Sequence, residues 1–296
     1  MADAAAHAVS QLLAGHGHRA RSVRLLASGL DHAAYEVDGN LIVRVASHPD
    51  PIARAGQVER ETRLLRVVAT VSPVAVPVPL LTDPDRGCIA YAKLPGEPLL
   101  ALPDAVAHAA PVGAALGGFL AALHALPVEP LADIVGADDS PPAAWLGEAR
   151  LLYDRLVSRI PPERRAAIAA FLHAEPPLAS HARVVAHNDL GIEHVLVDPA
   201  TWHVTGVIDW TDAALTDPAR DFGPVYRDLG PDALDAALRA YGAGGPGRRG
   251  LRRRARFYAR CGVLEDLAYG LDTGKNAYVT KSIAALGFLF PPGEAW

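Results

Sequence analysis

The sequence predicts an α+β fold with two parts, a small β-rich N-terminal part that carries one helix and a larger, mainly helical C-terminal part. Two observations support this division. Residues 23–46 contain β-rich runs, whereas from residue 113 onward apolar residues recur at helical spacing. A strand in between breaks at Pro95 and Gly96, where we place the boundary. The predicted segments are a β-rich part at 1–92, a short connection at 93–97 and a mainly helical part at 98–296.

The N-terminal part combines a hairpin with one amphipathic helix. The tetrapeptide VDGN, between two of the β-rich runs, is a hairpin signal. The segment QVERETRLLRVVA, at 57–69, places one acidic and three apolar residues on one helical face. These residues are Glu61, Leu64, Leu65 and Val68. A carboxylate on the edge of an apolar face needs a partner. The proline-rich segment 72–80 is too rigid for a helix and is predicted to be extended.

The C-terminal part begins and ends with helices and is interrupted by strands. Helices are expected at 113–127, along the face marked by Trp145 and Leu152, and at 163–173. Strands are expected on both sides of a polar turn within residues 184–210. Helices resume from about residue 231 to the C-terminal region.

Composition excludes several functional classes. Half of the 296 residues are hydrophobic, so the chain can bury a core, and its net charge of −5 argues against nucleic-acid binding. Cys88 and Cys261 are the two cysteines, and neither lies in a CxxC motif, which fits a reduced cytosolic protein. We find no signal peptide and no apolar run of about 18 residues. We therefore expect a cytoplasmic protein, monomeric or homodimeric, that binds neither membrane nor nucleic acid.

The stretch VVAHNDLGIEHVLVDPATWHVTGVIDW, residues 184–210, concentrates the polar groups that carry chemistry. Asp189 and Asp209 each lie at a strand end, and a hairpin brings them together. Carboxylates at such ends commonly hold Mg²⁺ through oxygen. His187, two residues before Asp189, can brace the backbone of the turn. An aspartate, a ligand five residues later and a second aspartate after a hairpin match the arrangement that kinases use for phosphoryl transfer.

These motifs resemble those of the aminoglycoside phosphotransferase family, which are small-molecule kinases with a two-lobed protein-kinase-like fold. The family pattern His-x-Asp-x4-Asn, followed by Ile-Asp-Trp, corresponds here to HNDLGIEH at 187–194 and VIDW at 207–210. DPARDF at 217–222 follows. VERETRLL is similar to the αC helix of this fold, KLPGEPL to its hinge, and LAALHALP to the first helix of its C-terminal lobe. The resemblance covers nearly the whole chain, although no P-loop motif is present.

The resemblance implies a role for each matching residue. Asp189 corresponds to the catalytic base that orients the acceptor hydroxyl, and Asp209 to the ligand of the Mg²⁺ ion that bridges the nucleotide phosphates. Glu61 corresponds to the acid of the αC helix. Its usual partner is a lysine, but this chain has Arg44, which can hold a carboxylate and a phosphate together. Asp221 is expected to organise the catalytic loop.

The resemblance also places the nucleotide, either ATP or GTP. The covering loop corresponds to ASGLDHA at 27–33, which contains Ser28. The base is expected to lie against the backbone near Ala92 and Leu94.

One position departs from the family pattern. The metal-binding asparagine is replaced by His194, and Mg²⁺ prefers oxygen ligands. The macrolide phosphotransferases of this family have a similar His-x-Asp-x4-His pattern, so His194 can be a working replacement that binds metal. The alternative is that a second metal site has decayed and the chain is a nucleotide-binding pseudokinase.

The acceptor is the least determined part of the prediction. Asp212, Glu265 and Asp266 are acids near the expected acceptor site, and they suit a cationic amine or aminosugar. The alternative is that they face solvent or pair with nearby arginines. Trp145 can supply an apolar wall, although packing in the core is the more common role for such a residue. The predicted function is transfer of the γ-phosphate to a hydroxyl of a macrolide or aminoglycoside type of antibiotic, with a choline or amino-alcohol kinase as the alternative.

Overall fold

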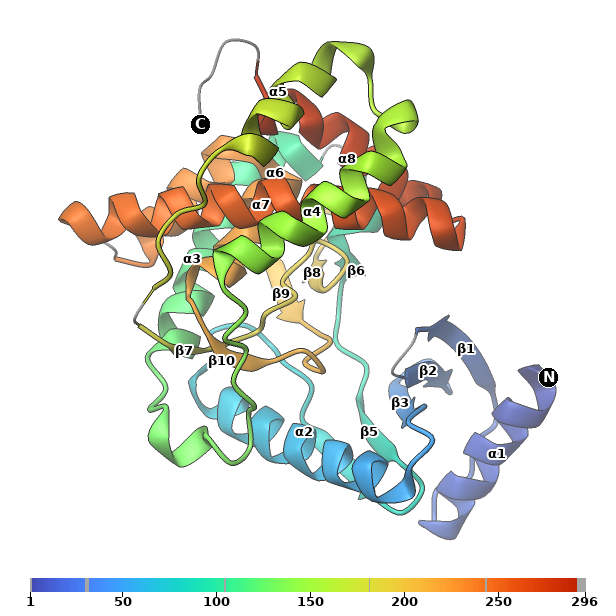
Figure 1. Ribbon diagram of the computed structural model, residues 1–296. Coiled ribbons are helices and arrows are strands. Elements are labelled where there is room, and N and C mark those ends of the chain that lie inside the picture. Colours follow the sequence, from blue (N-terminus) through green and yellow to red (C-terminus); the bar gives the residue numbers. More distant parts are fainter. Residues whose placement is uncertain (1, 30–31, 104, 181, 243, 292–296) are drawn as a thin grey trace. The chain divides into compact units, whose positions relative to one another are not determined.

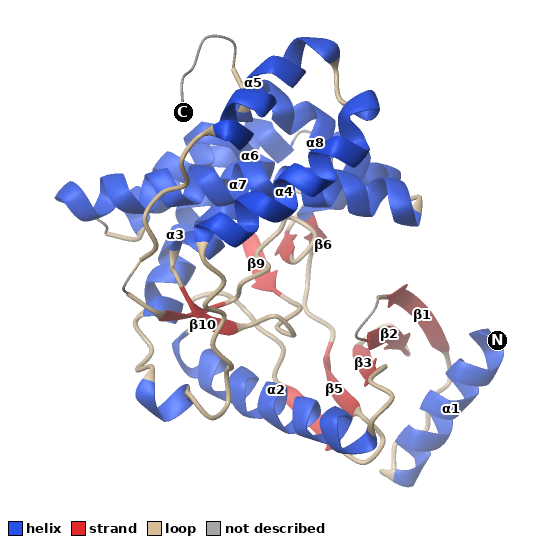
Figure 2. Ribbon diagram, in the orientation of Figure 1, coloured by secondary structure: helices blue, strands red, loops and turns tan. Residues whose placement is uncertain are grey.

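The computed structural model describes residues 2–29, 32–103, 105–180, 182–242 and 244–291, and it divides into two compact units. These units are Met1–Pro95 and Gly96–Trp296, so the division lies within the residues that were expected to form a hinge. The first unit is built around a β-sheet and the second is mainly helical (Figures 1 and 2). This confirms the predicted α+β class.

A five-stranded antiparallel sheet forms the centre of the N-terminal unit, with the strand order β1-β2-β3-β5-β4. Its strands are β1 (Val23–Ser28), β2 (His32–Val37), β3 (Leu41–Ala46), β4 (Pro79–Asp83) and β5 (Cys88–Ala92). Helix α2 (Pro51–Val71) begins where the carboxylate of Asp50 accepts a hydrogen bond from the Ile52 amide, and Pro51 occupies its first turn. Glu61, the predicted acid, lies on this helix.

The sequence analysis did not predict helix α1 (Ala2–Gly15). Its residues Val9, Leu12 and Leu13 are buried in one apolar cluster with Tyr35 and Val43 of the sheet. These three residues recur at helical spacing, so the signal was present in the sequence, and packing against the sheet stabilises the alanine-rich helix.

The C-terminal unit is a group of helices with two small sheets. Its helices are α3 (Ala109–His124), α4 (Pro142–Leu156), α5 (Pro162–His173), α6 (Ala219–Ala240), α7 (Gly245–Thr273) and α8 (Asn276–Leu289). One sheet pairs β6 (Glu97–Pro98), β8 (Val195–Val197) and β9 (Val204–Val207), and the other pairs β7 (Val184–Ala186) with β10 (Ala214–Thr216). Short 3-10 helices cover Leu99–Ala101, Ala105–His108, Glu129–Leu131 and Val157–Arg159.

Helix α6 begins twelve residues before the predicted start at residue 231. The chain is already helical from Ala219, and it kinks at Gly230, which has a positive φ of 83° just before Pro231. Proline favours the first turn of a helix, so the sequence signal at Pro231 marks the segment after the kink. The earlier segment contains Pro224 and was therefore not recognised as helical.

Helix α3 packs on α6 through glycines. A Cβ atom on Gly113 or Gly117 would overlap the backbone of Ala233 or Ala237. Together with the preceding 3-10 turn, α3 is the one helical stretch in the described part of the chain that is long and apolar enough to span a membrane. This contradicts the expectation that no apolar run is long enough. The contacts with α6 account for the apolar composition, because they bury one side of α3 in the unit.

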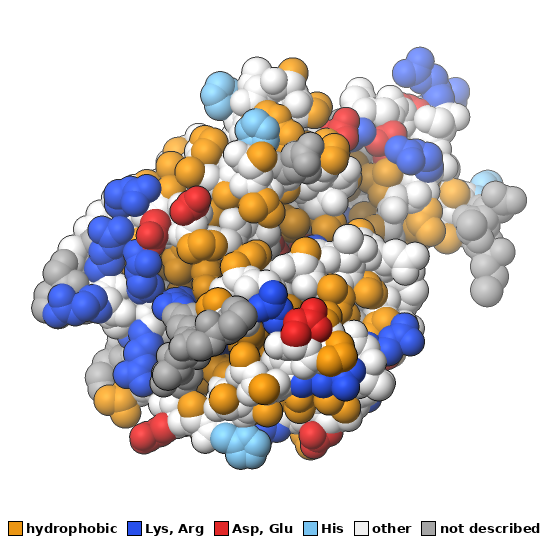
Figure 3. Space-filling view, turned by 90° about the horizontal axis from the view of Figure 1, so that it is seen from above, with side chains coloured by type: hydrophobic (Ala, Val, Ile, Leu, Met, Phe, Trp, Pro, Cys, Tyr) orange, Lys and Arg blue, Asp and Glu red, His pale blue; other side chains and the backbone are white. Residues whose placement is uncertain are grey.

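The start of α7 carries a basic run, GRRGLRRRARFYAR at 247–260, and only part of this run is a solvated face. Figure 3 shows Lys and Arg side chains gathered at the edge where α7 begins. Arg252 pairs with Asp235, and Arg254 makes two contacts with Asp217, at 2.6 and 3.2 Å. Arg260 is buried and donates to the Leu289 carbonyl at 2.7 Å. Several of these arginines therefore join α7 to its neighbours.

The close approach of α3 and α6 can be tested with two neighbouring glycines. We expect Gly117→Ala to lower the free energy of unfolding by about 1–3 kcal/mol, because the added methyl group overlaps the α6 backbone. Gly118→Ala is the matched control, since its Cβ meets no atom within 4 Å. The control should be neutral or stabilise by up to about 1 kcal/mol through helix propensity. Equal changes in the free energy of unfolding for the two variants, measured by urea unfolding, would contradict this packing.

Candidate active site

A strand pairing brings the polar residues of the 184–210 stretch together. Strand β7 ends at Ala186 and the polar turn follows, and β8 then pairs antiparallel with β9 so that Val195 lies opposite Val207. The ladder continues one step further, because the Ile208 amide donates to the His194 carbonyl at 2.9 Å. The end of the turn therefore lies beside the residue that precedes Asp209.

His194 lies between the carboxylates of Asp189, the predicted catalytic base, and Asp209, the predicted metal ligand. Its Nε2 is 3.3 Å from Oδ2 of Asp189, and its Nδ1 is 3.8 Å from Oδ2 of Asp209. Thr211 donates from Oγ1 to the other carboxylate oxygen of Asp209 at 3.1 Å. Asp189 and Asp209 are thus gathered around one imidazole ring, as the hairpin predicted.

The two carboxylates favour the protonated form of this histidine. Burial alone would lower the pKa of His194, but the hydrogen bond with Asp189 and the charges of Asp189, Glu193 and Asp209 raise it to about 9. Burial would likewise raise the pKa of Asp189, yet the contact with His194 holds that pKa well below its usual range. At neutral pH the group is therefore an imidazolium between two carboxylates.

This protonation state bears on the predicted metal. Mg²⁺ is usually held by one or two carboxylates and completes its shell with water and phosphate oxygens, so Asp209 and Asp189 fit that donor set. An imidazolium has no free lone pair and does not fit it. No group of three or more His, Cys, Asp and Glu side chains suited to a metal occurs among the residues that the structure describes. A metal-binding role for His194 stays a prediction.

His187 braces the turn from inside the unit. It is fully buried, its Nε2 lies 3.0 Å from the Ile208 carbonyl, and its Nδ1 is 3.4 Å from the Asp189 amide. Burial lowers the pKa of His187, so the ring is neutral, with its proton on Nε2 facing the carbonyl. The ring lies 4.7 Å from that of Trp210.

Asp221 anchors the start of the turn. Its carboxylate is fully buried in the first turn of α6 and accepts from the amides of His187, at 3.0 Å, and Asn188, at 2.7 Å. His124 of α3 lies 2.9 Å from the same carboxylate. Asn188 has a positive φ of 68°, which these two amide bonds fix in place.

The predicted acceptor acids have different surroundings. Asp266 is buried and lies 3.0 Å from Nε of Arg227 and 2.8 Å from Nζ of Lys281, so two cations already surround it. Asp212 is exposed, in the turn after Asp209. Glu265 instead opens into a hollow of the C-terminal unit.

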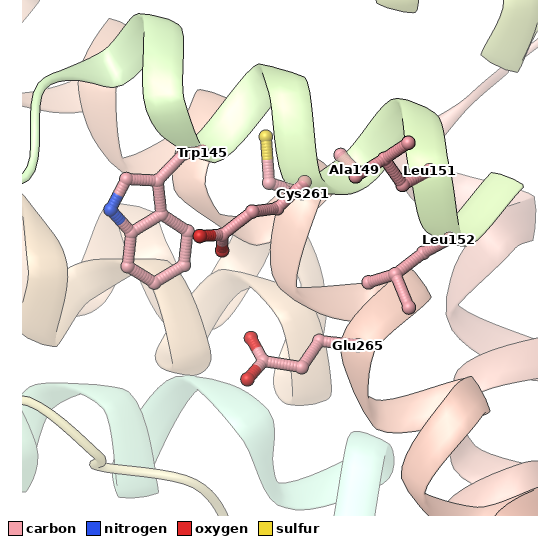
Figure 4. A pocket seen from close by; sticks show the side chains of 7 residues that line it. Trp145, Ala149, Leu151, Leu152, Cys261 and Glu265 are labelled. Carbon is pink, nitrogen blue, oxygen red and sulfur yellow. The ribbon is translucent and has the colours of Figure 1, made fainter.

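This hollow lies between α4 and α7 and has a volume of about 320 Å³ (Figure 4). It is lined by Trp145, Glu148, Ala149, Leu151, Leu152, Cys261 and Glu265. The lining therefore combines an aromatic and aliphatic wall with two carboxylates.

The cavity is electrostatically linked to the polar turn. Burial is the main cause that raises the pKa of Glu265, and the charges of Asp189 and Glu148 raise it further. The charges of Arg227 and Arg220 lower this pKa and so oppose the shift. Arg220 also lies over the ring of Trp145, with its guanidinium carbon 4.1 Å from the centroid.

The sequence analysis missed Glu148 and Lys281. Glu148 lies three residues after Trp145, a spacing that places both on one helical face and could have revealed it. Lys281 stands in the apolar segment KSIAALGFL, where a charged residue implies a buried partner. Both signals were present in the sequence.

In the N-terminal unit, Arg44 and Glu61 form a buried ion pair, with side chains only 7% and 9% exposed. The other guanidinium nitrogen of Arg44 lies 3.0 Å from Nδ1 of His32. Ser28 lies at the exposed end of β1 and Ala92 at the end of β5, followed by the partly buried Leu94. Residues 30–31 of the predicted covering loop lie outside the described residues. The nucleotide contacts of these residues stay predictions.

Most of the chain, including the polar turn, matches a known protein family. The sequence model of the phosphotransferase enzyme family matches residues 22–258. The macrolide 2'-phosphotransferase MphH from Brachybacterium faecium is 31% identical, with a TM-score of 0.63 over 98% of this chain and 99% of that one.

Two further proteins are more distant. The GDP complex of aminoglycoside 2'-phosphotransferase-IIIa is 20% identical, with a TM-score of 0.71 over 95% of this chain and 96% of that one, and this likeness confirms the kinase-like fold. The uncharacterized protein YcbJ of Bacillus subtilis (strain 168) is 30% identical over 103 residues, which are 34% of this chain and only 33% of that protein.

The protonated state of His194 gives a pH test. Its pKa is raised from 6.5 to about 9, so the pair with Asp189 adds stability that is fully present below pH 6.5 and is lost as pH rises through about 9. We expect the imidazole to titrate near pH 9 by NMR, in EDTA and without nucleotide, and its midpoint to fall in Asp189→Asn. Asp139→Asn, which removes an exposed pair with Arg183, should leave the midpoint unchanged. A midpoint at or below 6.5 in the unmodified protein would contradict the assignment.

Proposed function

This chain belongs to the phosphotransferase enzyme family, as its motifs predicted, and we propose that it transfers the γ-phosphate of ATP or GTP to a hydroxyl of an antibiotic of macrolide type. The observation that carries this proposal is the cavity between α4 and α7, which we propose as the acceptor cavity. Its lining combines an apolar wall with Glu265, whose pKa is raised in part by the charge of Asp189. The proposal also places the reaction in the cytoplasm, where both nucleotides are available.

Asp189 is proposed to orient the acceptor hydroxyl. Its low pKa makes it a weak base, but phosphoryl transfer passes through a loose transition state in which the attacking oxygen needs little prior deprotonation. The carboxylate can therefore act mainly by aligning the hydroxyl and taking its proton late. Protonated His194 keeps Asp189 ionised for that purpose.

Each unit carries residues with a proposed role toward the nucleotide. Asp209 would hold Mg²⁺, which neutralises charge on the transferred phosphoryl group when it is bound. In the N-terminal unit, Arg44 would contact a phosphate while Glu61 and His32 fix its guanidinium group. The exposed backbone at Ala92 is proposed to face the nucleotide base.

A macrolide-type acceptor suits the cavity better than a small amino alcohol. Trp145 and Leu152 provide apolar area against which one part of a large ring can lie, and Glu265 can pair with an amine on an attached sugar. A choline-sized cation would leave most of the 320 Å³ unfilled. The 31% identical relative is itself named a macrolide 2'-phosphotransferase. An aminoglycoside, whose surface is polar throughout, gains less from the aliphatic wall.

The assigned role of Asp189 can be tested with an isosteric change. We expect Asp189→Asn to lower kcat by about 10²–10⁴-fold, because the amide cannot accept the hydroxyl proton. Nucleotide affinity should stay within a few-fold, measured by calorimetry, since this residue acts on the acceptor. Asp272→Asn, which removes an exposed pair with Arg155, is the control for loss of a carboxylate. The assay measures release of nucleoside diphosphate with macrolides, aminoglycosides and choline. Binding of nucleotide with transfer to no acceptor would favour a pseudokinase.

The acceptor class can be tested at Glu265. We expect Glu265→Gln to raise KM for a cationic macrolide about tenfold or more, because a hydrogen bond to a charged group contributes about 1.5–3 kcal/mol. KM for the nucleotide should not change. A macrolide whose amine has been acylated should show the same KM with both proteins. Equal loss with the acylated compound would mean that Glu265 supports the cavity without recognising the amine.

A further inference from the structure

The C-terminal unit contains a second charged cluster, the buried ion network, which is separate from the pair of carboxylates around His194. Its members come from four segments, and their side chains are only 2–13% exposed. They are Glu193 of the polar turn, Arg227 and Asp228 of α6, Asp266 of α7 and Lys281 of α8. Two cations thus face three carboxylates.

Lys281 is the centre of this network. Its Nζ lies 3.1 Å from Glu193, 3.2 Å from both oxygens of Asp228 and 2.8 Å from Asp266. These carboxylates account for all three donors of the ammonium group. Arg227 supports the same carboxylates, because it contacts both oxygens of Asp228, at 2.8 and 2.9 Å, and lies 3.0 Å from Asp266.

The network holds the second half of the polar turn at two points. The carboxylate of Glu193 pairs with Lys281, and the Ile192 amide donates to Oδ2 of Asp228 at 3.2 Å. Glu193 comes directly before His194 and four residues after Asp189. Asp221 fixes the start of the turn, and the network fixes the end.

Gly191 permits the first of these contacts. A Cβ atom at this position would lie 2.6 Å from both carboxylate oxygens of Glu193. The carboxylate therefore folds back over Gly191 to reach Lys281, and any larger residue would displace it. Glycine at 191 therefore permits this position of the Glu193 carboxylate.

Stability alone does not explain five buried charges. Desolvating ions is expensive, and well-packed apolar residues in their place are often neutral or stabilising. An arrangement of this kind instead fixes one geometry, since each ion must meet its partner. The network also reaches the acceptor cavity, because Asp266 is the neighbour of Glu265 on α7.

We propose that Lys281 is a positioning residue: through Glu193 it fixes the turn that carries Asp189 and His194, and through Asp266 it joins that turn to the helix that lines the acceptor cavity. The inference rests on the proposed phosphotransfer, which uses Asp189. Lys281 itself touches neither the acceptor nor the nucleotide in this assignment.

The first test is Glu193→Gln, which removes one of three carboxylates and leaves two cations facing two carboxylates. Because the remaining charges balance, the melting temperature should stay within a few degrees. We expect kcat to fall about 10- to 100-fold, the loss that a misplacement of about 1 Å produces. KM for the nucleotide should stay within twofold. Unchanged kcat would overturn the proposal.

The second test moves the carboxylate without removing a charge. Gly191→Ala should lower kcat as Glu193→Gln does, because the methyl group displaces the Glu193 side chain. Gly287→Ala on α8 is the matched control, since its added Cβ meets no atom within 4 Å, and kcat should be unchanged. Lys281→Met should lower kcat and Lys281→Arg should restore most of it. A loss of kcat that only follows a loss of folded protein would also overturn the proposal.

Amide hydrogen exchange separates this inference from the proposed function. We expect the Ile192 amide and its neighbours to exchange faster in Glu193→Gln and in Gly191→Ala, with no change in α3. If the unmodified protein phosphorylates no acceptor, the proposed function fails, while faster exchange still supports the positioning of the turn. Unchanged exchange in both variants would contradict the role of Lys281 independently of activity.

Discussion

The arrangement of the candidate active site depends on one buried carboxylate. The Asp221 carboxylate accepts hydrogen bonds from two consecutive backbone amides, those of His187 and Asn188. These bonds fix the backbone at Asn188, which has a positive φ. An unpaired carboxylate in this position would be very costly, so the contacts with the amides and with His124 are obligatory for the fold. Because the following residue is Asp189, the same contacts that satisfy Asp221 determine where the proposed catalytic group points.

Protonation states divide the histidines of the site into two kinds. His187 is neutral because it is fully buried and faces a carbonyl and an amide, whereas His194 is protonated because it lies between two carboxylates. The residue types are the same and the surroundings differ, so sequence alone cannot assign the charge. In the proposed enzyme, the positive charge at 194 keeps Asp189 ionised, which an asparagine could not do.

The fold and the pair of carboxylates could be predicted because they depend on local patterns. Strand periodicity on both sides of the polar turn was enough to bring Asp189 and Asp209 together. The ion network was not predictable in the same way, because Glu193, Asp228 and Lys281 are far apart in sequence and meet only when α6 and α8 pack against the turn. Helix α1 was not predicted although Val9, Leu12 and Leu13 recur at helical spacing, and these are the residues that it buries against the sheet.

Rigidity of the turn explains why one polar side chain in it can remain accessible. The backbone is held at its start by Asp221, at Ile192 by Asp228 and at its end by the pairing of His194 with Ile208. Asp189 lies among these anchors and keeps 42% of its side-chain surface exposed. A group that acts on a bound hydroxyl must be both accessible and fixed, because reorganisation at the moment of reaction adds to the barrier. Backbone anchoring by buried charges provides both properties, since these contacts restrict the turn and leave the Asp189 side chain 42% exposed.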